Sequence, residues 1–598
     1  MNEQIKSHRG STLPVCGDPV RLGRRRFLVG AGALAGAGAV SSILPSGLVE
    51  AALPAGASSF TPLPAAVRVA DTRFPAQAVF TRISPQHIRV QVKNRAGVPA
   101  SASAVVLTAT AVNWSEPNWV AVYPSGTNLP TVSNLNMVRG PGEVTANLVT
   151  VKVGADHSVD LYQRMPCDVI VDLLGYYTPV SGAVKAGRFK ALAEAARAID
   201  TRQSFGFARS GSFTPVDLTG LIPADASSVV INLTATECTG PGHFSALPAT
   251  ADETKQPTTS SLNVTYAGDT RAASVIVPLP TINGRRILKI YTHTAAKLIV
   301  DVNGFFTSGE SPLSSEGLFV PLTPQRILDT RWPGEIGKLW PSWVVERRLP
   351  SAVAPYASSI VVNVTGDASR GPGYFTVSAA QRALPATSNV NWMIAGATVP
   401  NHVITPVTAT HGFQVYSSHG AHVIVDLAGY FTGSSLIPNV APYQNPPPPA
   451  APPNWVMHLP RLGKTSIVRE GDPRAITDAG DSWHWTGTGY MGQSAHVAVF
   501  AHRTEHGGPY RYLHLLAVGD TFTVTTTDNR VYVYRVAGRT MVRGNSSAGP
   551  SVADILAATR AYPGTTMSLI ACTLSNWLPT SLWHRIVVTG ELIDWYEI

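Results

Sequence analysis

The fold is decided by the stretch Met567-Ser568-Leu569-Ile570-Ala571-Cys572-Thr573, an apolar run that ends at a cysteine close to the C-terminus. A second apolar run follows it, Arg585-Ile586-Val587-Val588-Thr589-Gly590, and begins with an arginine. Short runs of this composition predict two neighbouring strands. Such strands would bring a thiol and a guanidinium to one site.

A third apolar run lies upstream and leads into a histidine: Val497-Ala498-Val499-Phe500-Ala501-His502. A cysteine, a histidine and an arginine at strand ends would supply a nucleophile, an acid or base, and a donor to an oxyanion. These are the groups that an enzyme of acyl transfer requires.

These residues resemble those of a sortase of the actinobacterial class E type. The likeness is carried by four segments with the order and spacing of the family: His502-Arg503-Thr504, Gly519-Asp520, Ser568-Leu569-Ile570-Ala571-Cys572 and Arg585-Ile586-Val587-Val588-Thr589-Gly590. The family usually has glycine where this chain has Ala501, and threonine where it has Ser568 and Ala571. The resemblance covers about the last quarter of the chain and implies an eight-stranded barrel.

The resemblance and the strand positions together select Cys572, His502 and Arg585 as the catalytic residues. Seven histidines follow Trp455, and His502 is preferred because it directly follows an apolar strand, with His514 as the runner-up. Arg503 is the rival of Arg585, which opens the strand after the cysteine.

The implied function is an exported cysteine transpeptidase that cleaves a sorting-signal peptide through a thioacyl intermediate. The acyl group would pass to a cell-wall amine acceptor. Two alternatives stay open: a cysteine peptidase, in which water replaces the amine, and an adhesive envelope protein with an inactive sortase-like end. The substitutions at Ala501 and Ala571 motivate the second alternative.

Residues 60–434 repeat themselves three times. The motif Arg68-Val69-Ala70-Asp71-Thr72-Arg73 returns at Arg197–Arg202 and Arg326–Arg331, and each copy closes on an aspartate followed by a glycine and two aromatic residues. Alternating Val, Ile and Thr with frequent Gly and Pro predict an all-β sandwich in each copy. Each copy is far longer than a solenoid repeat, so we expect the three copies to fold as separate domains, which we call beads. We interpret the Asp-Thr-Arg motif as a structural ion pair rather than a ligand site.

The remaining segments define the domain organisation. Arg24-Arg25-Arg26-Phe27-Leu28 and the Gly/Ala-rich run after it resemble a twin-arginine export signal, cleaved or kept as an anchor. We predict a signal segment over 1–52, β-rich repeats over 60–180, 190–308 and 318–434, a proline-rich linker over 435–454, and a sortase-like domain over 455–598. The protein would be extracellular or associated with the cell wall or membrane.

Composition narrows the partners. The net charge of +9 is spread over 598 residues without clustered Lys/Arg and aromatic platforms, which argues against nucleic acid. An anionic envelope polymer is a possible ligand of the repeats. The chain has no Cys-x-x-Cys and no His-Glu-x-x-His, so no metal or cofactor site is predicted.

Overall fold

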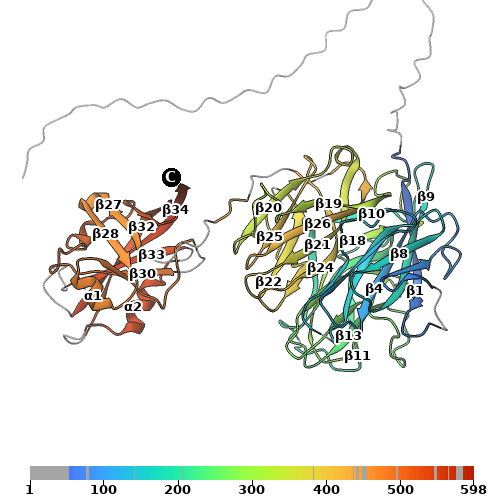
Figure 1. The fold of residues 1–598 in the computed structure, drawn as a ribbon, viewed down its shortest axis with the longest axis horizontal. Coiled ribbons are helices and arrows are strands. Elements are labelled where there is room, and N and C mark those ends of the chain that lie inside the picture. The colour runs from blue at the N-terminus through green and yellow to red at the C-terminus, as the bar shows by residue number, and fades with distance from the viewer. Residues whose placement is uncertain are drawn as a thin grey trace, which may run out of the picture. The chain divides into compact units, whose positions relative to one another are not determined.

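The computed structural model describes most of the chain after residue 52: residues 53–75, 80–140, 142–204, 206–380, 383–435, 437–438, 443–446, 454–492, 496–544, 549–562, 565–573 and 583–598. These residues form mostly strands with a few short helices, which confirms the predicted all-β class (Figure 1). The predicted signal segment at 1–52 lies outside the described residues. In the described ranges, no helix is long and apolar enough to cross a membrane.

Each repeat is a sandwich of two antiparallel sheets. In the first repeat, one sheet has the order β1 (Ser58–Asp71), β9 (Asp168–Pro179), β4 (Ala104–Val112), β7 (Thr145–Lys152). The other has the order β2 (Phe80–Ser84), β3 (His87–Gln91), β8 (Ser158–Gln163), β5 (Asn118–Pro124), β6 (Leu135–Met137). We call the first the inner sheet and the second the outer sheet.

The other two repeats have the same arrangement. The inner sheet of the second repeat is β10 (Phe189–Asp200), β18 (Lys297–Thr307), β12 (Ala226–Thr236), β15 (Arg271–Pro278), and its outer sheet is β11 (Ser212–Asp217), β17 (Arg285–Thr292), β13 (Gly242–Pro248), β14 (Leu262–Val264), with β16 (Thr281–Ile282) beside β17. The inner sheet of the third repeat is β19 (Phe319–Asp329), β26 (His422–Thr432), β21 (Ala357–Asp367), β24 (Val399–Pro406), and its outer sheet is β20 (Trp343–Arg348), β25 (Gly412–Ser417), β22 (Gly373–Ala379), β23 (Val390–Trp392).

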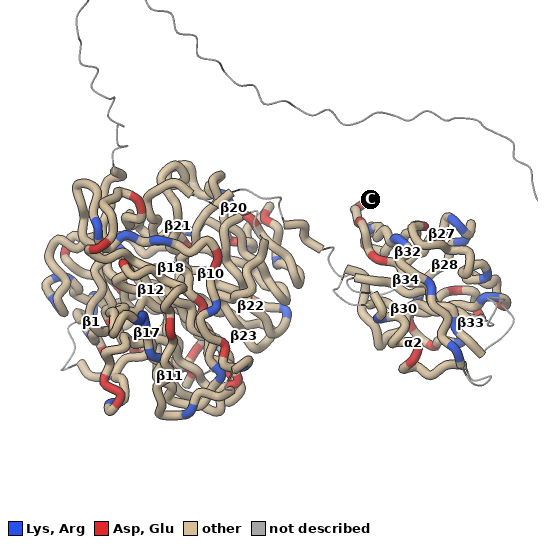
Figure 2. Tube along the Cα trace, turned by 180° about the vertical axis from the view of Figure 1, so that it is seen from behind, with Lys and Arg blue, Asp and Glu red and all other residues tan. Residues whose placement is uncertain are grey.

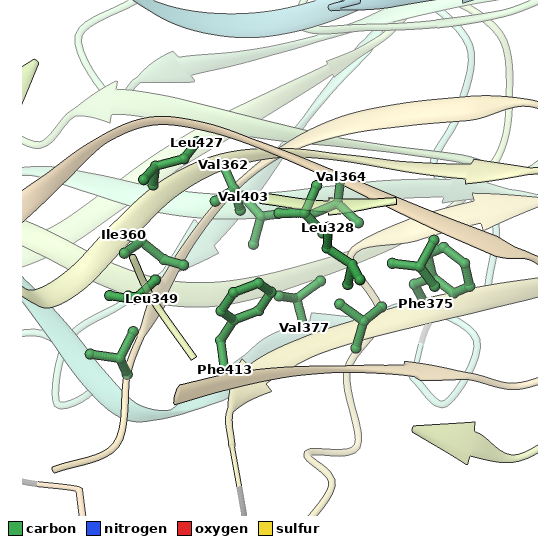
Figure 3. Close-up of a cluster of buried hydrophobic side chains, with 14 of the residues drawn as sticks. Leu328, Leu349, Ile360, Val362, Val364, Phe375, Val377, Val403, Phe413 and Leu427 are labelled. Atoms are coloured by element: carbon green, nitrogen blue, oxygen red, sulfur yellow. The ribbon is translucent and has the colours of Figure 1, made fainter. Parts of the chain in front are cut away.

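The core of each repeat lies between its two sheets. In the third repeat, Val362, Val364 and Leu427 of the inner sheet meet Phe375 and Phe413 of the outer sheet, and all five are buried (Figure 3). The alternation of strand side chains explains this, because every second residue of an inner strand points to the outer sheet. The residues between them point the other way and form a further core.

That further core joins the three repeats, so the expectation of separate beads is wrong. The inner sheets of the first and third repeats form one eight-stranded sheet through the pairing of Ser58 with Phe319. Two aromatic rings from each repeat meet in one buried cluster, and these rings are Phe60, Tyr177, Phe189, Phe306, Phe319 and Phe431. The sequence could not show this second apolar face, because inner strands that are buried on both sides lose their simple alternation.

The glycine before the two aromatic residues of each repeat is required by this packing. A Cβ on Gly175 would lie 2.5 Å from the ring of Phe60, and a Cβ on Gly429 would lie 2.5 Å from the ring of Phe319. Real Cβ atoms do not approach other atoms so closely, so a larger residue would displace the rings of the shared core.

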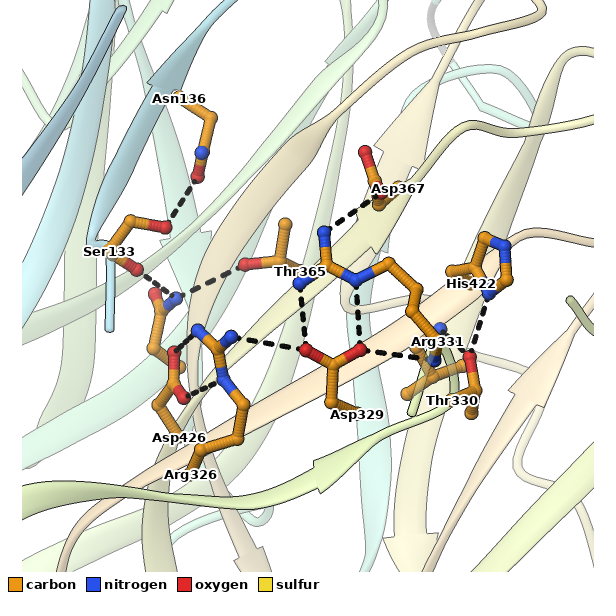
Figure 4. Close-up of polar contacts among 12 residues, drawn as sticks. Ser133, Asn136, Arg326, Asp329, Thr330, Arg331, Thr365, Asp367, His422 and Asp426 are labelled. Atoms are coloured by element: carbon orange, nitrogen blue, oxygen red, sulfur yellow. Dashed lines mark hydrogen bonds and ion pairs between the residues drawn. The ribbon is translucent and has the colours of Figure 1, made fainter. Parts of the chain in front are cut away.

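The Asp-Thr-Arg motif forms the predicted ion pairs. Arg326 donates to both carboxylate oxygens of Asp426 at 2.8 and 3.3 Å, and Arg331 donates to Asp329 at 2.7 and 2.8 Å (Figure 4). Burial raises the pKa of Asp426, and the hydrogen bonds from Arg326 oppose that rise. The same pairing occurs in the other repeats as Arg68 with Asp172 and Arg197 with Asp301.

The leading arginine of the motif also reaches the next repeat. Arg68 of the first repeat donates to the carbonyl of Thr258 at 2.9 Å, and Arg197 of the second donates to that of Ala386 at 3.1 Å. The third repeat is linked to the first by a hydrogen bond of 2.8 Å that Asn363 donates to the carbonyl of Ser133. The motif therefore holds neighbouring repeats together, which supports its structural interpretation.

The start of the proline-rich segment is attached to the third repeat. Asn445 accepts from the amide of Val344 at 2.6 Å and donates to its carbonyl at 3.0 Å, and the indole of Trp343 donates to the carbonyl of Pro446 at 2.6 Å. Asn445 therefore takes the place of a strand partner at the edge of β20. Residues 447–453 lie outside the described residues.

The C-terminal part is a closed barrel of eight strands, as predicted. Its order is β27 (Asn454–Leu459), β28 (Lys464–Arg469), β29 (Ser482–His484), β30 (His496–Phe500), β33 (Thr566–Thr573), β34 (His584–Glu597), β32 (Arg530–Arg543), β31 (Thr521–Thr525). Two short helices accompany it, α1 (Pro473–Asp478) and α2 (Val552–Thr559), and 3₁₀ turns span Pro460–Leu462 and Leu513–Leu515. The barrel interior is apolar, and Ile555 of α2 covers part of its outside.

Charges are mixed in both parts of the described chain. Figure 2 shows Lys and Arg interspersed with Asp and Glu along the trace, without a continuous run of either sign.

Candidate active site

Cys572 lies near the end of β33, and its neighbours define the direction of its side chain. Leu569 and Ala571 point into the barrel interior, whereas Ile570 packs on the outer face. Since side chains alternate along a strand, Cys572 shares the face of Ile570. Cys572 is partly exposed, whereas Cys167 and Cys238 are buried and burial raises the pKa of each of their thiols to about 12. Among the described cysteines, Cys572 is the accessible thiol.

Arg585 lies directly opposite Cys572 on the neighbouring antiparallel strand. The register of β33 and β34 pairs Cys572 with Arg585. Directly opposed residues have Cβ atoms about 5 Å apart and lie on the same face of the sheet. A guanidinium hydrogen of Arg585 is donated to the carbonyl of His584 at 3.1 Å. The strand pairing thus brings the thiol and this arginine together, as the sequence predicted.

His502 reaches the same end of the barrel from the other side of β33. The strand β30 pairs parallel with β33, with Phe500 opposite Ile570, and the amide of Ala501 donates to the carbonyl of Ile570 at 3.2 Å. His502 follows β30 at the position where Cys572 follows Ile570. The ring of His502 is half-buried, and its Nε2 lies 3.0 Å from Asp478 Oδ1.

Arg503, the rival arginine, is buried beneath the site. It donates to the carbonyl of Cys572 at 3.2 Å and to that of Arg511 at 3.3 Å. Burial lowers the pKa of Arg503, and the nearby thiol of Cys572 opposes that effect. Its hydrogen bond to the carbonyl of Cys572 fixes the backbone of the cysteine.

His514 is hydrogen-bonded to the buried Arg503. Its Nδ1 accepts a hydrogen bond from Arg503 at 2.9 Å. Burial and the positive charges of Arg503 and Arg539 lower its pKa. A histidine that accepts from a guanidinium is a poor proton donor, which favours His502 over this runner-up.

The two alanines that differ from the usual sortase pattern point away from the thiol. Ala501 and Ala571 are both buried in the barrel core, at 7% and 2% exposure. A threonine at position 571 would place its hydroxyl among apolar side chains and not beside Cys572. Both alanines are therefore part of the packed interior of the barrel.

Asp478 belongs to the site, but the sequence analysis missed it. It is the last residue of α1, whose N-cap Asp472 accepts from the amide of Ala475 at 2.7 Å. The hydrogen bond from His502 lowers the pKa of Asp478. Asp472-Pro473 is a recognisable helix start, but no local pattern links that helix to a histidine 24 residues later.

The fold and the site define a class of protein. Residues 457–593 match the family model of the sortase domain. The C-terminal part of the chain is therefore a sortase domain, as the resemblance implied.

Particular relatives belong to the class E sortases. Sortase SrtE1 of Streptomyces coelicolor is 27% identical over 147 residues, which are 23% of this chain and 40% of the relative. The chain thus spans about two fifths of the length of this curated relative.

The chain is also similar to parts of solved structures. The crystal structure of sortase E1 from Streptomyces coelicolor with a tripeptide in its active site is 23% identical, with a TM-score of 0.21, and the match covers 24% of this chain and 91% of that one. Sortase E from Streptomyces avermitilis is 24% identical, with a TM-score of 0.20 and the same two coverages.

Proposed function

We propose that the sortase domain is a cysteine transpeptidase that cleaves a sorting-signal peptide of a surface protein and transfers it to a cell-wall amine. The proposal is carried by the convergence of Cys572, His502 and Arg585 on one end of three adjacent strands. The partly exposed thiol is on the strand between the one that leads to His502 and the one that carries Arg585, and a thiol, an imidazole and a guanidinium are the groups that acyl transfer requires.

The first half of the reaction forms a thioester. The thiolate of Cys572 attacks the backbone carbonyl carbon of the signal peptide, and Arg585 donates hydrogen bonds to the oxygen that becomes negative. The C–N bond then breaks, and His502 gives a proton to the leaving amine nitrogen. The N-terminal part of the peptide stays on the sulfur.

The second half releases the enzyme. An incoming amine attacks the thioester carbonyl while His502 takes its proton, and the C–S bond breaks to return the thiolate. Asp478 orients the imidazole through its hydrogen bond. Arg503 fixes the backbone carbonyl of Cys572, so the sulfur keeps its position through both halves. Water in place of the amine would make the enzyme a peptidase.

The transfer is tested by offering a peptide with an LPXTG-like or LAXTG-like signal together with an amine, and separating ligated from hydrolysed product. We expect ligated product from the wild type and none from Cys572→Ala. If only hydrolysed product formed at saturating amine, the protein would be a peptidase and not a transpeptidase. Absence of both products would refute the proposed enzymatic activity.

We further propose that the chain is exported by a twin-arginine signal within residues 1–52 and acts outside the cell. The support is the Arg24-Arg25 pair and the Gly/Ala-rich run after it. Replacing both arginines by lysine should leave the precursor in the cytoplasm, and unaltered export would refute this route. The predicted division into repeats, linker and catalytic domain belongs to the same proposal.

We also propose that the three repeats bind an envelope polymer. The observation that favours it is an aromatic pair at the same place on each outer sheet: Trp119 with Tyr162, His243 with Tyr291, and Tyr374 with Tyr416, with ring centroids 5.6, 5.8 and 6.2 Å apart. Rings of this kind can stack on sugars, and a hollow of about 280 Å³ beside Trp119 adds hydrogen-bonding groups from Ser133, Asn136, Arg331 and Asp367.

Sedimentation with purified cell walls tests this binding. Trp119→Ala and Tyr374→Ala should each lower the bound fraction several-fold, whereas Phe207→Ala, which removes an exposed ring elsewhere, should leave it unchanged. Equal binding by all four proteins would refute the proposal.

A further inference from the structure

A cluster of three metal-binding side chains lies beside the candidate nucleophile. Asp478 at the end of α1 meets His502 and His506, and one ligand atom from each lies within 4.8 Å of the others. The Nε2 atoms of His502 and His506 are 3.0 and 3.7 Å from Asp478 Oδ1. The two imidazole rings face each other at a centroid distance of 5.3 Å.

These distances suit a transition-metal ion. Zinc binds histidine nitrogen and carboxylate oxygen at about 2.0–2.2 Å, so two ligands of a tetrahedral site lie about 3.3 Å apart. The two distances to Asp478 Oδ1 fall on either side of that value, and a small rotation of each side chain would centre them. Two imidazoles and one carboxylate are a ligand set for zinc and similar divalent ions, whereas magnesium prefers oxygen ligands.

The backbone holds the three residues together. His506 has a left-handed φ of 51°, an uncommon conformation for a residue other than glycine. Its carbonyl oxygen would lie 2.8 Å from a Cβ on Gly480, so the loop that carries His506 packs on the end of α1. The turn continues through Gly508, where a Cβ would lie 2.5 Å from the carbonyl oxygen of Arg503.

The cluster is also accessible. The side chains of Asp478, His502 and His506 are 40%, 30% and 42% exposed, which allows an ion to enter and leaves room for water as a fourth ligand. No local sequence signature predicts the cluster, because the fold brings Asp478 to His502 from 24 residues away.

We propose that Asp478, His502 and His506 bind one divalent ion of the zinc type, and that the bound ion reversibly inhibits the enzyme. The ion takes the imidazole nitrogen of His502 that would otherwise carry the proton. Histidine ligates a metal through a nitrogen that carries no proton, so the bound ion keeps this nitrogen from acting as the proton donor. The inhibition rests on the proposed function, whereas the binding of the ion does not.

The binding is tested by titrating the reduced full-length protein with Zn²⁺ by calorimetry, with Co²⁺ absorption as a second readout. We expect one site in the wild type. His506→Asn and Asp478→Asn should each weaken binding at least 10-fold, and asparagine at 506 keeps the left-handed backbone accessible. His458→Asn, at an exposed histidine of the same domain, should bind like the wild type. Mg²⁺ should give no binding at the same concentrations.

Two results would overturn the proposal. Unchanged zinc affinity in both site variants would place the ion elsewhere. Loss of binding in Cys572→Ala, which we expect to bind normally, would mean that the thiol holds the ion instead. The folded state of each variant is checked by its thermal transition, and the two site variants act on different elements, so misfolding of one leaves the other as a test.

Inhibition is measured as the ratio of transfer rates with and without zinc. The zinc concentration for half inhibition should rise at least 10-fold in His506→Asn, and a chelator should restore the wild-type rate. An unshifted concentration would refute the regulatory role. A chain that binds zinc through His506 but transfers no peptide would keep the metal site and refute the proposed function.

Discussion

Phe306→Ala tests whether the three repeats are one folding unit. The ring of Phe306 is fully buried, and its centroid lies 4.3 Å from that of Phe60 and 5.4 Å from that of Phe189. It also contacts the rings of Tyr177 and Phe431. Removing a buried phenylalanine side chain costs about 3–5 kcal/mol, and we expect about 4 kcal/mol here because the contacts with the surrounding rings are lost with it. That change is about a 1,000-fold shift in the folding equilibrium.

The assay is urea unfolding of the full-length protein, followed by tryptophan fluorescence and circular dichroism. Tryptophans lie in the first and third repeats as well as the barrel, for example Trp119 and Trp392, whereas Phe306 belongs to the second repeat. We therefore expect the unfolding of the first and third repeats to shift with that of the second. Phe207→Ala in the same repeat removes a ring that is 45% exposed and should cost less than about 1 kcal/mol. A loss below about 1 kcal/mol for Phe306→Ala, or a shift confined to one repeat, would refute the shared core.

Three further predictions concern single residues. Arg585→Lys keeps the positive charge but loses the planar guanidinium, so the transfer rate measured in single-turnover kinetics should fall about 10- to 1,000-fold. A fall of less than twofold would show that Arg585 does not donate to the oxyanion. His502→Ala should reduce the transfer rate to near background while His514→Ala retains most of it, and the reverse order would identify His514 as the proton donor. Burial lowers the pKa of His402 from 6.5 to about 3, so the unfolded state binds the additional proton and stability should fall as the pH drops from 6.5 towards 3, by up to about 1.4 kcal/mol per unit for this group. His402→Gln should flatten this part of the stability profile relative to the wild type, and parallel profiles would refute the assignment.

The sequence predicted most of the barrel that carries the site. The strands β30, β33 and β34 appear where the three apolar runs that lead to His502, Cys572 and Arg585 place them. No apolar run marks the strands β27 to β29, because they are short and interrupted by polar residues. Cys572 and Arg585 could be paired in advance because both lie on long neighbouring strands.

The sequence could not predict contacts that depend on tertiary packing. Asp478 meets His502 only because α1 folds back on the loop after β30, and no periodic pattern encodes that approach. The ring cluster around Phe306 was likewise hidden, since each repeat contributes only two rings and the cluster exists only when three repeats close on one another. Repeated motifs showed that three copies exist, but not that they share a core.

The most direct test of the enzymatic account is the intact mass of the protein shortly after mixing with a signal peptide, without an amine acceptor. The account predicts an added mass equal to the N-terminal part of the cleaved peptide, located on the fragment that contains Cys572, absent in Cys572→Ala and removed when an amine is added. An adduct on Cys167 or Cys238, or an unmodified protein after the peptide has been cleaved, would contradict a thioacyl intermediate on Cys572.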